Sequence, residues 1–296
     1  MCTKHRLIAS MSSSNKGHKM EQTVIQKIQS LHHELIAHQA LRMRRFIVDM
    51  VFQARAAHLG SALSCVDILA TLYHGIVDVE KIKAGHAARD YILLSKGHAA
   101  TALYAALISA GIMPEQAVQQ YAQKHSGLCG HPVKDAYVGI EASTGSLGQG
   151  LSMGIGIALA CKHDGLHNKV YVVLGDGECQ EGSVWESAMF APRYHLSNLV
   201  VIVDANQLQG LDRTCDVMPG DLVKKFQAFG WQGCVVDGHD YADLHAAITA
   251  PAQAPCVIVA HTIKGKGLAF AQDKLEWHYK SLTPELYEQA MCMLKS

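Results

Sequence analysis

The chain has 296 residues, of which 49% are hydrophobic and only 18% are charged, and its basic and acidic residues cancel to a formal net charge of zero. This composition supplies ample material for a buried core, and the small number of charges suits a surface partly covered by another subunit. With no basic excess to attract phosphate backbones or anionic lipid, nucleic acids and membranes are not expected partners.

Cysteine usage points to a reducing compartment. Nine cysteines are scattered along the chain without any Cys-x-x-Cys pair. An odd count, partly within apolar runs, favours reduced thiols over the alternative of a disulfide framework. The tightest grouping of metal-binding residue types, His125, Cys129 and His131, fits no standard closed zinc site. We therefore expect a cytoplasmic protein without structural zinc.

The N-terminal part is predicted to begin with an extension and a long helix. Residues 1–20 contain only a short apolar stretch, too short for a secretory signal, and are expected to be disordered, with Met20 as an alternative start. From residue 21 to about 57, apolar residues recur at spacings of three and four, which predicts a helix. The whole of 21–296 is interpreted as a single domain.

Shorter helices follow, at 64–76, 99–110 and 115–121. Gly111 is a stop signal for the second, and Pro114 suits the N-terminus of the third.

The stretch 147–161 is apolar and glycine-rich, but a membrane-spanning helix needs about 20 apolar residues and this run is shorter. We interpret it as a buried helix in which Gly150, Gly154 and Ala158 let a neighbouring element pack closely.

The centre of the chain changes character. The runs 169–174 and 198–203 are apolar and β-branched, and a predicted helix at 184–191 separates them. Strands without alternation, joined by a helix, are typical of a parallel sheet covered on both faces. Further elements are predicted as strands at 91–94, 234–236 and 256–260 and a helix at 241–248. The predicted fold class is α/β, with a doubly wound, mostly parallel sheet, and the tail containing Trp277 is expected to pack on its rim.

Polar residues follow the two central strands. Asp176 lies between Gly175 and Gly177 after the first, and Asn206 follows the second, thirty residues later. Ligands of parallel sheets bind beyond the carboxyl ends of the strands, and a βαβ unit of about 30 residues brings these two ends together. Carboxylate and amide oxygens suit Mg²⁺, which takes its other ligands from phosphate and water. Gly-Asp-Gly alone is more often an ordinary turn, and the paired arrangement favours the metal.

The motifs around these residues resemble those of a known family. The resemblance to the thiamine diphosphate motif lies in GDGECQEGSVWESAMFAPRYHLSNLVVIVDANQLQ. Successive transketolase segments are similar, in the same order, to AAHLGSALS, SKGHAATALY and EASTGSLGQGLSMGIGIALA. The resemblance covers about residues 40–280 and identifies the chain as a member of the transketolase family, with the thiamine-diphosphate-binding fold.

The resemblance implies two cofactors, thiamine diphosphate and Mg²⁺, with Ca²⁺ or Mn²⁺ as substitutes. Its implied metal ligands are Asp176, Asn206 and the carbonyl of Leu208. The residues it implies around the cofactor are Gly145, Leu147, Gly175, Asp176, Gly177, Glu178, Asn206 and His98.

Four histidines match those that the family uses to handle ketose hydroxyls and protons: His58, His98, His131 and, with a weaker local match, His278. Histidine suits proton traffic because its ordinary pKa is about 6.5. Taken singly, each is more often a structural histidine, and only the surrounding motifs reverse that preference. The family pattern also implies a carboxylate network at a subunit interface, formed by Glu181 and Glu186. The alternative for these two is solvated acids favoured by a helix N-terminus.

The family's pyrimidine-binding and C-terminal domains have no counterpart here. The resemblance therefore implies a partner, a C-terminal transketolase subunit that carries the pyrimidine-binding domain, in a heterotetramer with two copies of each chain. The expected activity is transfer of a two-carbon ketol unit from a ketose phosphate to an aldose acceptor. One departure is His58-Leu59-Gly60, where the family has His-Pro-Gly, which bears on the identity of the sugar. The alternatives are a subunit of another thiamine diphosphate enzyme, similar to deoxyxylulose-phosphate synthase or 2-oxo acid dehydrogenase, and a non-catalytic subunit that keeps the fold.

Overall fold

The computed structural model describes residues 4–135 and 137–295, with side chains from residue 27 onward. Within these residues a single sheet has the strand order β1-β2-β3-β5-β4, and every neighbouring pair is parallel. The strands are β1 (Tyr91–Leu94), β2 (Val170–Gly175), β3 (Leu199–Ala205), β4 (Gln232–Asp237) and β5 (Cys256–His261). The expected α/β fold with a parallel sheet is confirmed.

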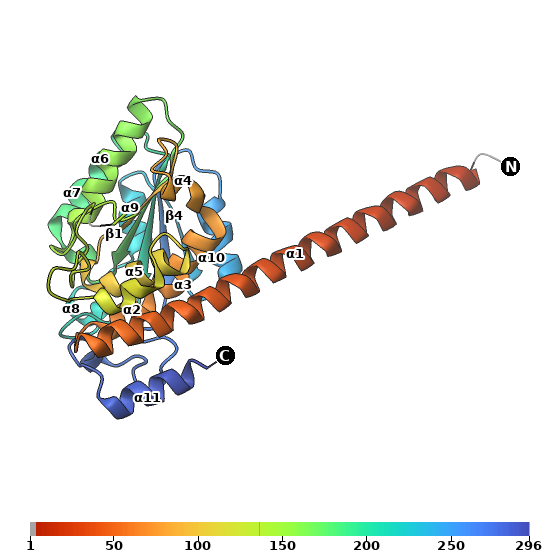
Figure 1. Ribbon diagram of the computed structural model, residues 1–296. Coiled ribbons are helices and arrows are strands. Elements are labelled where there is room, and N and C mark those ends of the chain that lie inside the picture. Colours follow the sequence, from red (N-terminus) through yellow and green to blue (C-terminus); the bar gives the residue numbers. More distant parts are fainter. Residues whose placement is uncertain (1–3, 136, 296) are drawn as a thin grey trace.

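Helices cover both faces of this sheet (Figure 1). One face packs against α1 (Lys4–Gln53), α3 (Val66–Thr71), α5 (Ala100–Ser109) and α10 (Tyr241–Thr249), and the other against α6 (Gln149–His163), α7 (Gly182–Arg193) and α9 (Leu222–Ala228). Successive residues of β2 enter different cores: Tyr171 and Val173 face the first, and Val172 and Leu174 the second. This is why the central strands are apolar throughout rather than alternating.

The remaining elements are short. They are α2 (Leu59–Ser64), the π-helical turn η1 (Leu72–Ile76), α4 (Val79–Lys83), η2 (Gly97–Ala99), η3 (Glu115–Gln120), η4 (Glu178–Gln180), α8 (Thr214–Val217), η5 (Leu275–His278) and α11 (Pro284–Met293).

Two predicted helices differ from the structure. The helix expected at 64–76 is divided at Cys65, whose ψ of 8° separates α2 from α3, and its last turn is the π-helical η1. The helix expected at 115–121 is the 3₁₀ segment η3.

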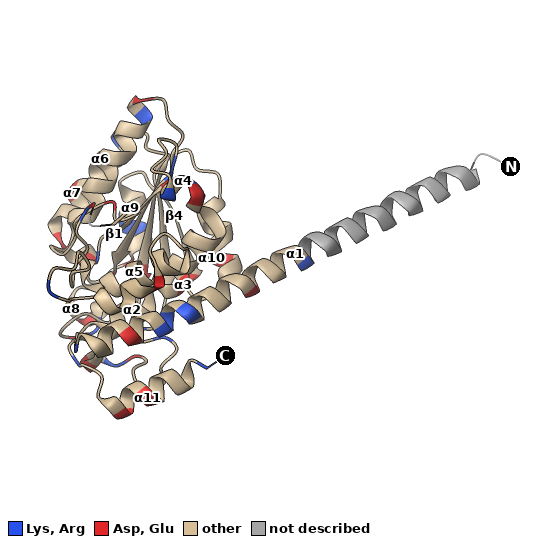
Figure 2. Cartoon of the chain, viewed as in Figure 1, with Lys and Arg blue, Asp and Glu red and all other residues tan. Residues whose placement is uncertain are grey.

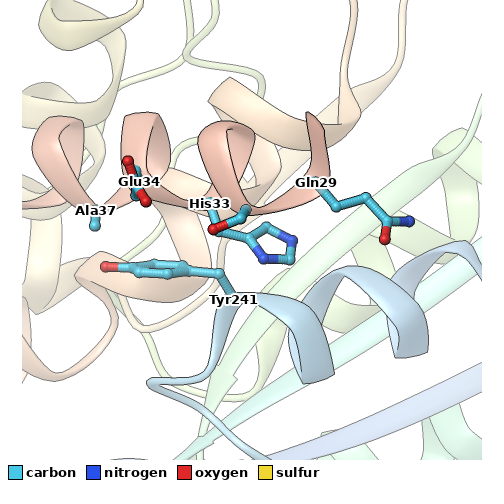
Figure 3. Close-up of a pocket in the computed structure, with 6 residues that line it drawn as sticks. Gln29, His33, Glu34, Ala37 and Tyr241 are labelled. Carbon is cyan, nitrogen blue, oxygen red and sulfur yellow. The ribbon is translucent and has the colours of Figure 1, made fainter. Parts of the chain in front are cut away.

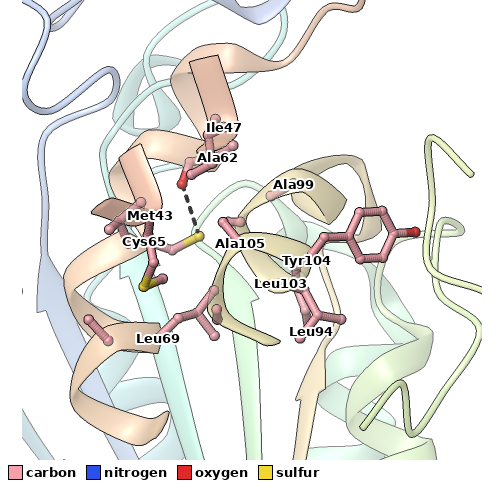
Figure 4. Packing of buried hydrophobic residues seen from close by; sticks show 14 of the residues in the cluster. Met43, Ile47, Ala62, Cys65, Leu69, Leu94, Ala99, Leu103, Tyr104 and Ala105 are labelled. Atoms are coloured by element: carbon pink, nitrogen blue, oxygen red, sulfur yellow. Dashed lines mark hydrogen bonds between the residues drawn. The ribbon is translucent and has the colours of Figure 1, made fainter. Parts of the chain in front are cut away.

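The second half of α1 forms much of the first core. Met43 and Ile47 of α1 are fully buried, and Figure 4 shows Met43 beside Cys65 and Ile47 beside Ala62. Farther toward the N-terminus, the side chain of Leu31 is 56% exposed. The expected disordered extension, 1–20, lies outside the residues whose side chains are described. The structure assigns α1 from Lys4 onward. A backbone assignment does not test disorder, and the expected disorder of 1–20 stays a prediction.

In the described part of the chain, positions of Lys and Arg are interspersed with positions of Asp and Glu (Figure 2). None of the helices in the described part combines the length and apolar character that a bilayer-spanning segment needs. Every cysteine whose side chain is described is free.

The C-terminal tail packs against the end of α1. The ring of Tyr287 in α11 stacks on Phe52 with centroids 4.2 Å apart, and its hydroxyl donates to Asp49 at 2.8 Å. Trp277 of η5 is buried, and the carbonyl of His278 accepts the amide of His58 at 3.1 Å. The tail thus lies on α1 and α2, whereas the sequence suggested the rim of the sheet, and it brings His278 next to His58.

Candidate functional site

The carboxyl ends of β2 and β3 open into one cavity of about 440 Å³. Gly175 and Asp204 are register partners at these ends, and the amide of Asp176 donates to the carbonyl of Asp204 at 3.3 Å. Asp176 and Asn206 both line the cavity. The structure therefore brings together the two side chains that the crossover geometry predicted to meet.

Asp176 is a buried carboxylate that bridges the two strand ends. One oxygen accepts the amide of Gly177 at 2.8 Å, and the other accepts the amide of Gln207 at 2.6 Å and the hydroxyl of Thr214 at 3.1 Å. Burial, together with the nearby charge of Asp204, raises its pKa. No Lys or Arg among the described residues forms an ion pair with it. A buried carboxylate in this condition is a good fit for a bound cation, which would hold it ionised.

Asn206 is held in one orientation. Its Nδ2 donates to Asp204 Oδ2 at 3.1 Å and lies 3.4 Å from Ser64 Oγ, while its Oδ1 accepts the amide of Leu208 at 3.1 Å. The oxygen, rather than the NH₂ group, therefore points toward the turn that carries Leu208, which also lines the cavity. The carbonyl of Leu208 accepts the ammonium of Lys264 at 2.9 Å, so a metal ion bound there would share this oxygen.

Lys96, which lines the cavity, forms a buried ion pair with Asp204, which does not. The carboxylate of Asp204 also accepts the hydroxyls of Ser64 and Thr262, and the ammonium of Lys96 donates to the carbonyl of Ser61 at 2.9 Å. Burial alone would raise the pKa of Asp204, but the adjacent Lys96 ammonium holds it below its ordinary value. The pair and its partners join α2, η2 and β3 at the site.

Lys264 places a second cation at the cavity wall. Its Nζ donates to the carbonyls of Leu208 and Gln209 at 2.9 and 3.1 Å and lies 3.1 Å from Nδ1 of His278. Burial and the charge of Lys96 lower its pKa to about 8. No carboxylate among the described residues forms an ion pair with Lys264. Its ammonium is therefore available to attract the negative charge of a diphosphate bound in the cavity.

Four histidines surround the cavity. The rings of His58, His98 and His278 form a triangle with centroid separations of 5.1 to 5.6 Å. His131 is exposed and lies over Gly145, where an added Cβ would come within 3.1 Å of its ring. The four histidines chosen from the sequence therefore meet in space, and their catalytic roles remain a proposal.

The environment changes the protonation expected for three of these rings. Burial, aided by Lys96, lowers the pKa of His98 to about 2, and burial together with Lys264 lowers that of His278 to about 4. The pKa of His58 is also lowered, mainly by burial. The lowered pKa values of these three rings favour the neutral imidazole over the charged form at neutral pH. A neutral imidazole offers one donor and one acceptor nitrogen to a hydrogen-bond partner.

Glu178 binds the loop that precedes α6 to the end of β2. Its buried carboxylate accepts the hydroxyl of Ser95 and the amides of Gly148 and Gly175, the last two at 2.9 and 3.0 Å. Leu147, immediately before Gly148, lines the cavity. The structure thus gives Glu178 a holding role toward the loop that presents Leu147, in addition to its place in the cavity wall.

The two acids predicted for a carboxylate network lie at and beyond the cavity mouth. Glu181 is exposed and lines the cavity. Glu186 is exposed on α7 and is not among the lining residues. Among the described residues, the carboxylates of Glu181 and Glu186 share no hydrogen-bond partner.

The charged residues that organise the site but were not among the predicted site residues are Lys96, Asp204 and Lys264. Lys96 stands in SKGHAATALY and Lys264 in the KGKG that precedes His278, so the motifs contained the signal. Asp204 belongs to the polar group Asp204-Ala205-Asn206 that ends the second central strand, and its contacts with Lys96 and Asn206 show how it organises the site.

Comparison with known proteins identifies relatives of similar length. The family model for transketolase, thiamine diphosphate binding domain, matches residues 36–290. The chain is 37% identical over 262 residues to one subunit of the apulose-4-phosphate transketolase of Phocaeicola vulgatus, a match that covers 87% of this chain and 93% of that protein. It is 36% identical over 264 residues to the 6-deoxy-6-sulfo-D-fructose transketolase subunit SqwG of a Clostridium species, covering 88% and 96%.

Longer relatives match over less than half of their length. Human transketolase is 38% identical over 275 residues, which is 92% of this chain and 42% of that protein. A solved transketolase structure from Campylobacter jejuni is similar with a TM-score of 0.81 and 27% identity, covering 88% of this chain and 43% of that one.

Proposed function

The chain belongs to the transketolase family through its thiamine diphosphate binding domain, and we propose that it is the diphosphate-holding subunit of a transketolase made of two polypeptides. The observation that carries this proposal is the convergence of Asp176, Asn206 and the histidine triangle on one cavity. A subunit of another thiamine diphosphate enzyme is disfavoured, because the relatives above are transketolases.

The proposed cofactor site uses hard oxygen donors and one cation. Asp176 and Asn206 would hold Mg²⁺ together with the carbonyl of Leu208, and Lys264 would balance diphosphate charge. When bound, thiamine diphosphate supplies the carbon nucleophile that carries the two-carbon ketol unit between sugars. Leu147, which lines the cavity in the loop fixed by Glu178, would contact the rings of the cofactor.

The histidines would act on the sugar. As neutral imidazoles, His58, His98 and His278 each offer one donor and one acceptor nitrogen to hydroxyl groups, and their close spacing suits neighbouring hydroxyls of one chain. His131, on the exposed side, would complete the set. These groups can orient the sugar and pass a proton at a hydroxyl oxygen.

The partner would supply the other half of the site. The subunit-type relatives have this chain's length, whereas the long transketolases have more than twice the matched length, which supports a second polypeptide. We propose a C-terminal transketolase subunit carrying the pyrimidine-binding domain, two copies of each chain, and Glu181 and Glu186 near the contact between sites. The proposed compartment is the cytoplasm, where free thiols stay reduced.

The proposed substrates are a ketose donor, as its phosphate, and an aldose acceptor. The test is to co-express the chain with the product of the adjacent reading frame and to assay the complex with thiamine diphosphate and Mg²⁺ against a panel of ketose phosphates and aldoses. Ketol transfer on any pair is the expected result. A complex that binds the cofactor and consumes 2-oxo acids, with no ketol transfer, would refute the proposal.

A further inference from the structure

We propose that a largely buried cluster outside the cavity, formed by Arg44, Asp67 and His239, helps to position Lys264. The three residues come from α1, α3 and the turn between β4 and α10. They act on the backbone of the segment 262–267, which follows β5 and carries Lys264. None of them lines the cavity.

Backbone hydrogen bonds hold part of the segment, since the amide of Gly265 donates to the carbonyl of Gly60 at 3.0 Å and the carbonyl of Lys264 accepts the amide of Asp273 at 3.0 Å, but these leave the amide of Ile263 and the carbonyl of Lys266 to side-chain partners. The segment leaves the sheet after His261 and turns through Gly265 and Gly267, both at positive φ, of 79° and 98°. Lys264 must nevertheless direct its ammonium at two carbonyls and an imidazole that belong to other parts of the chain. A shift of the segment would weaken all three contacts together, because hydrogen bonds depend steeply on distance and angle.

His239 joins Asp67 to the near side of Lys264. Its Nδ1 lies 2.7 Å from Asp67 Oδ2, and its Nε2 accepts the amide of Ile263 at 2.9 Å. A ring nitrogen that accepts an N–H carries no proton, so the other nitrogen, Nδ1, is the one that donates to Asp67. The carboxylate therefore fixes the tautomer, and the tautomer fixes the residue next to Lys264.

Arg44 joins the same carboxylate to the far side. Its Nη2 donates to Asp67 Oδ2 at 2.6 Å, and its Nε donates to the carbonyl of Lys266 at 3.3 Å. Its stem lies against Gly267, where an added Cβ would be 3.0 Å from Arg44 Cδ. His239 and Arg44, both bound to the carboxylate of Asp67, thus hydrogen-bond to the backbone on either side of Lys264, at Ile263 and Lys266.

A third partner of Asp67, Tyr241, forms no hydrogen bond with the segment among the described residues. The hydroxyl of Tyr241 donates to Asp67 Oδ1 at 2.7 Å. Figure 3 shows Tyr241 beside α1, where it lines a surface depression with His33 and Glu34. Tyr241→Phe therefore removes one hydrogen bond from Asp67 without touching the link to Lys264, and it serves as the matched control.

The first test is hydrogen exchange, followed by mass spectrometry, on the full chain. His239→Ala should speed exchange of the amides in 262–267 by about tenfold, since the hydrogen bond of Ile263 is lost. Tyr241→Phe should leave that exchange within about twofold of the parent, and His239→Gln, which can donate to Asp67 and accept from Ile263, should restore it. Equal exchange in His239→Ala and Tyr241→Phe would overturn the proposal.

Arg44→Lys provides a second route if His239→Ala does not fold. Lysine keeps the charge beside Asp67 but cannot also reach the carbonyl of Lys266, so exchange in 262–267 should again rise, and unchanged exchange counts against the cluster.

The second test rests on the proposed function. In the complex with its partner, His239→Ala should weaken thiamine diphosphate affinity, and should add little further loss to Lys264→Ala. If the loss of cofactor affinity in the double variant equals the product of the losses in the two single variants, His239 acts independently of Lys264, which contradicts the proposal. If the complex has no ketol transfer at all, the proposed function fails, while the exchange experiment still decides the role of the cluster.

Discussion

The ammonium of Lys96 and the carboxylate of Asp204 form an ion pair that is almost completely removed from water. Asp204 simultaneously fixes the amide of Asn206, so one carboxylate neutralises a buried cation and orients a proposed metal ligand. The end of β3 is therefore organised around Asp204, although Asp204 itself does not line the cavity.

Asp204→Asn should strongly destabilise the chain, because it leaves Lys96 charged, buried and unpaired. Breaking a buried pair in this way costs about 3–5 kcal/mol. The measurement is the free energy of unfolding in urea. The control is Glu80→Gln, which breaks the exposed pair with Lys83 and should cost less than about 1 kcal/mol. Similar losses in the two variants would contradict the assignment.

Asp176→Ala should abolish Mg²⁺-dependent binding of thiamine diphosphate in the reconstituted complex, measured by calorimetry. Asp216→Ala, an exposed change in the nearby α8, should leave affinity unchanged. Because the pKa of Asp176 is raised, binding by the wild type should weaken as the pH falls, as the carboxylate takes up a proton. An unchanged affinity in Asp176→Ala would refute the metal role.

His98→Ala and His131→Ala should each lower turnover by about 10²–10⁴-fold, since both are proposed to act on the sugar. His131→Ala should also keep cofactor affinity, because only His98 of these two is implied near the cofactor. Steady-state assays of the complex, with cofactor binding measured in parallel, separate the two effects. His167→Ala, at an exposed position outside the cavity, is the control. Wild-type turnover in the first two variants would show that they are misassigned.

Mild acid should destabilise the chain through His98. Its pKa is about 2 in the folded state against about 6.5 when unfolded, so below about pH 6.5 only the unfolded chain gains this proton. The stability is present above that pH and is lost as the pH falls. Between pH 7.5 and pH 5 the parent should lose about 2 kcal/mol more than His98→Asn.

The matched substitution for this pH experiment is His163→Asn, at a side chain that is 86% exposed. It should follow the parent at both pH values. If His98→Asn loses as much unfolding free energy as the parent between pH 7.5 and pH 5, the prediction for His98 is wrong.

The sequence by itself determined the sheet and the place of the site. Unbroken apolar runs at β2 and β3 have no polar face to offer water, so they require a covered parallel sheet, and their ends must lie side by side. The positions of Asp176 and Asn206 follow from that geometry, and local motifs identified His58, His98 and His131. Helix ends and breaks, such as that at Cys65, depended on packing that periodicity does not contain.

Only the tertiary structure decided what depends on contacts between distant segments. The pairing of Lys96 with Asp204 spans 108 positions, and that of Arg44 with Asp67 joins separate helices. The neutral state of His98 and the lowered pKa of Lys264 arise from burial and from neighbouring charges, and neither is a property of a local motif. Charge and protonation respond to the whole surroundings of a group in space, and a linear pattern records only its neighbours along the chain.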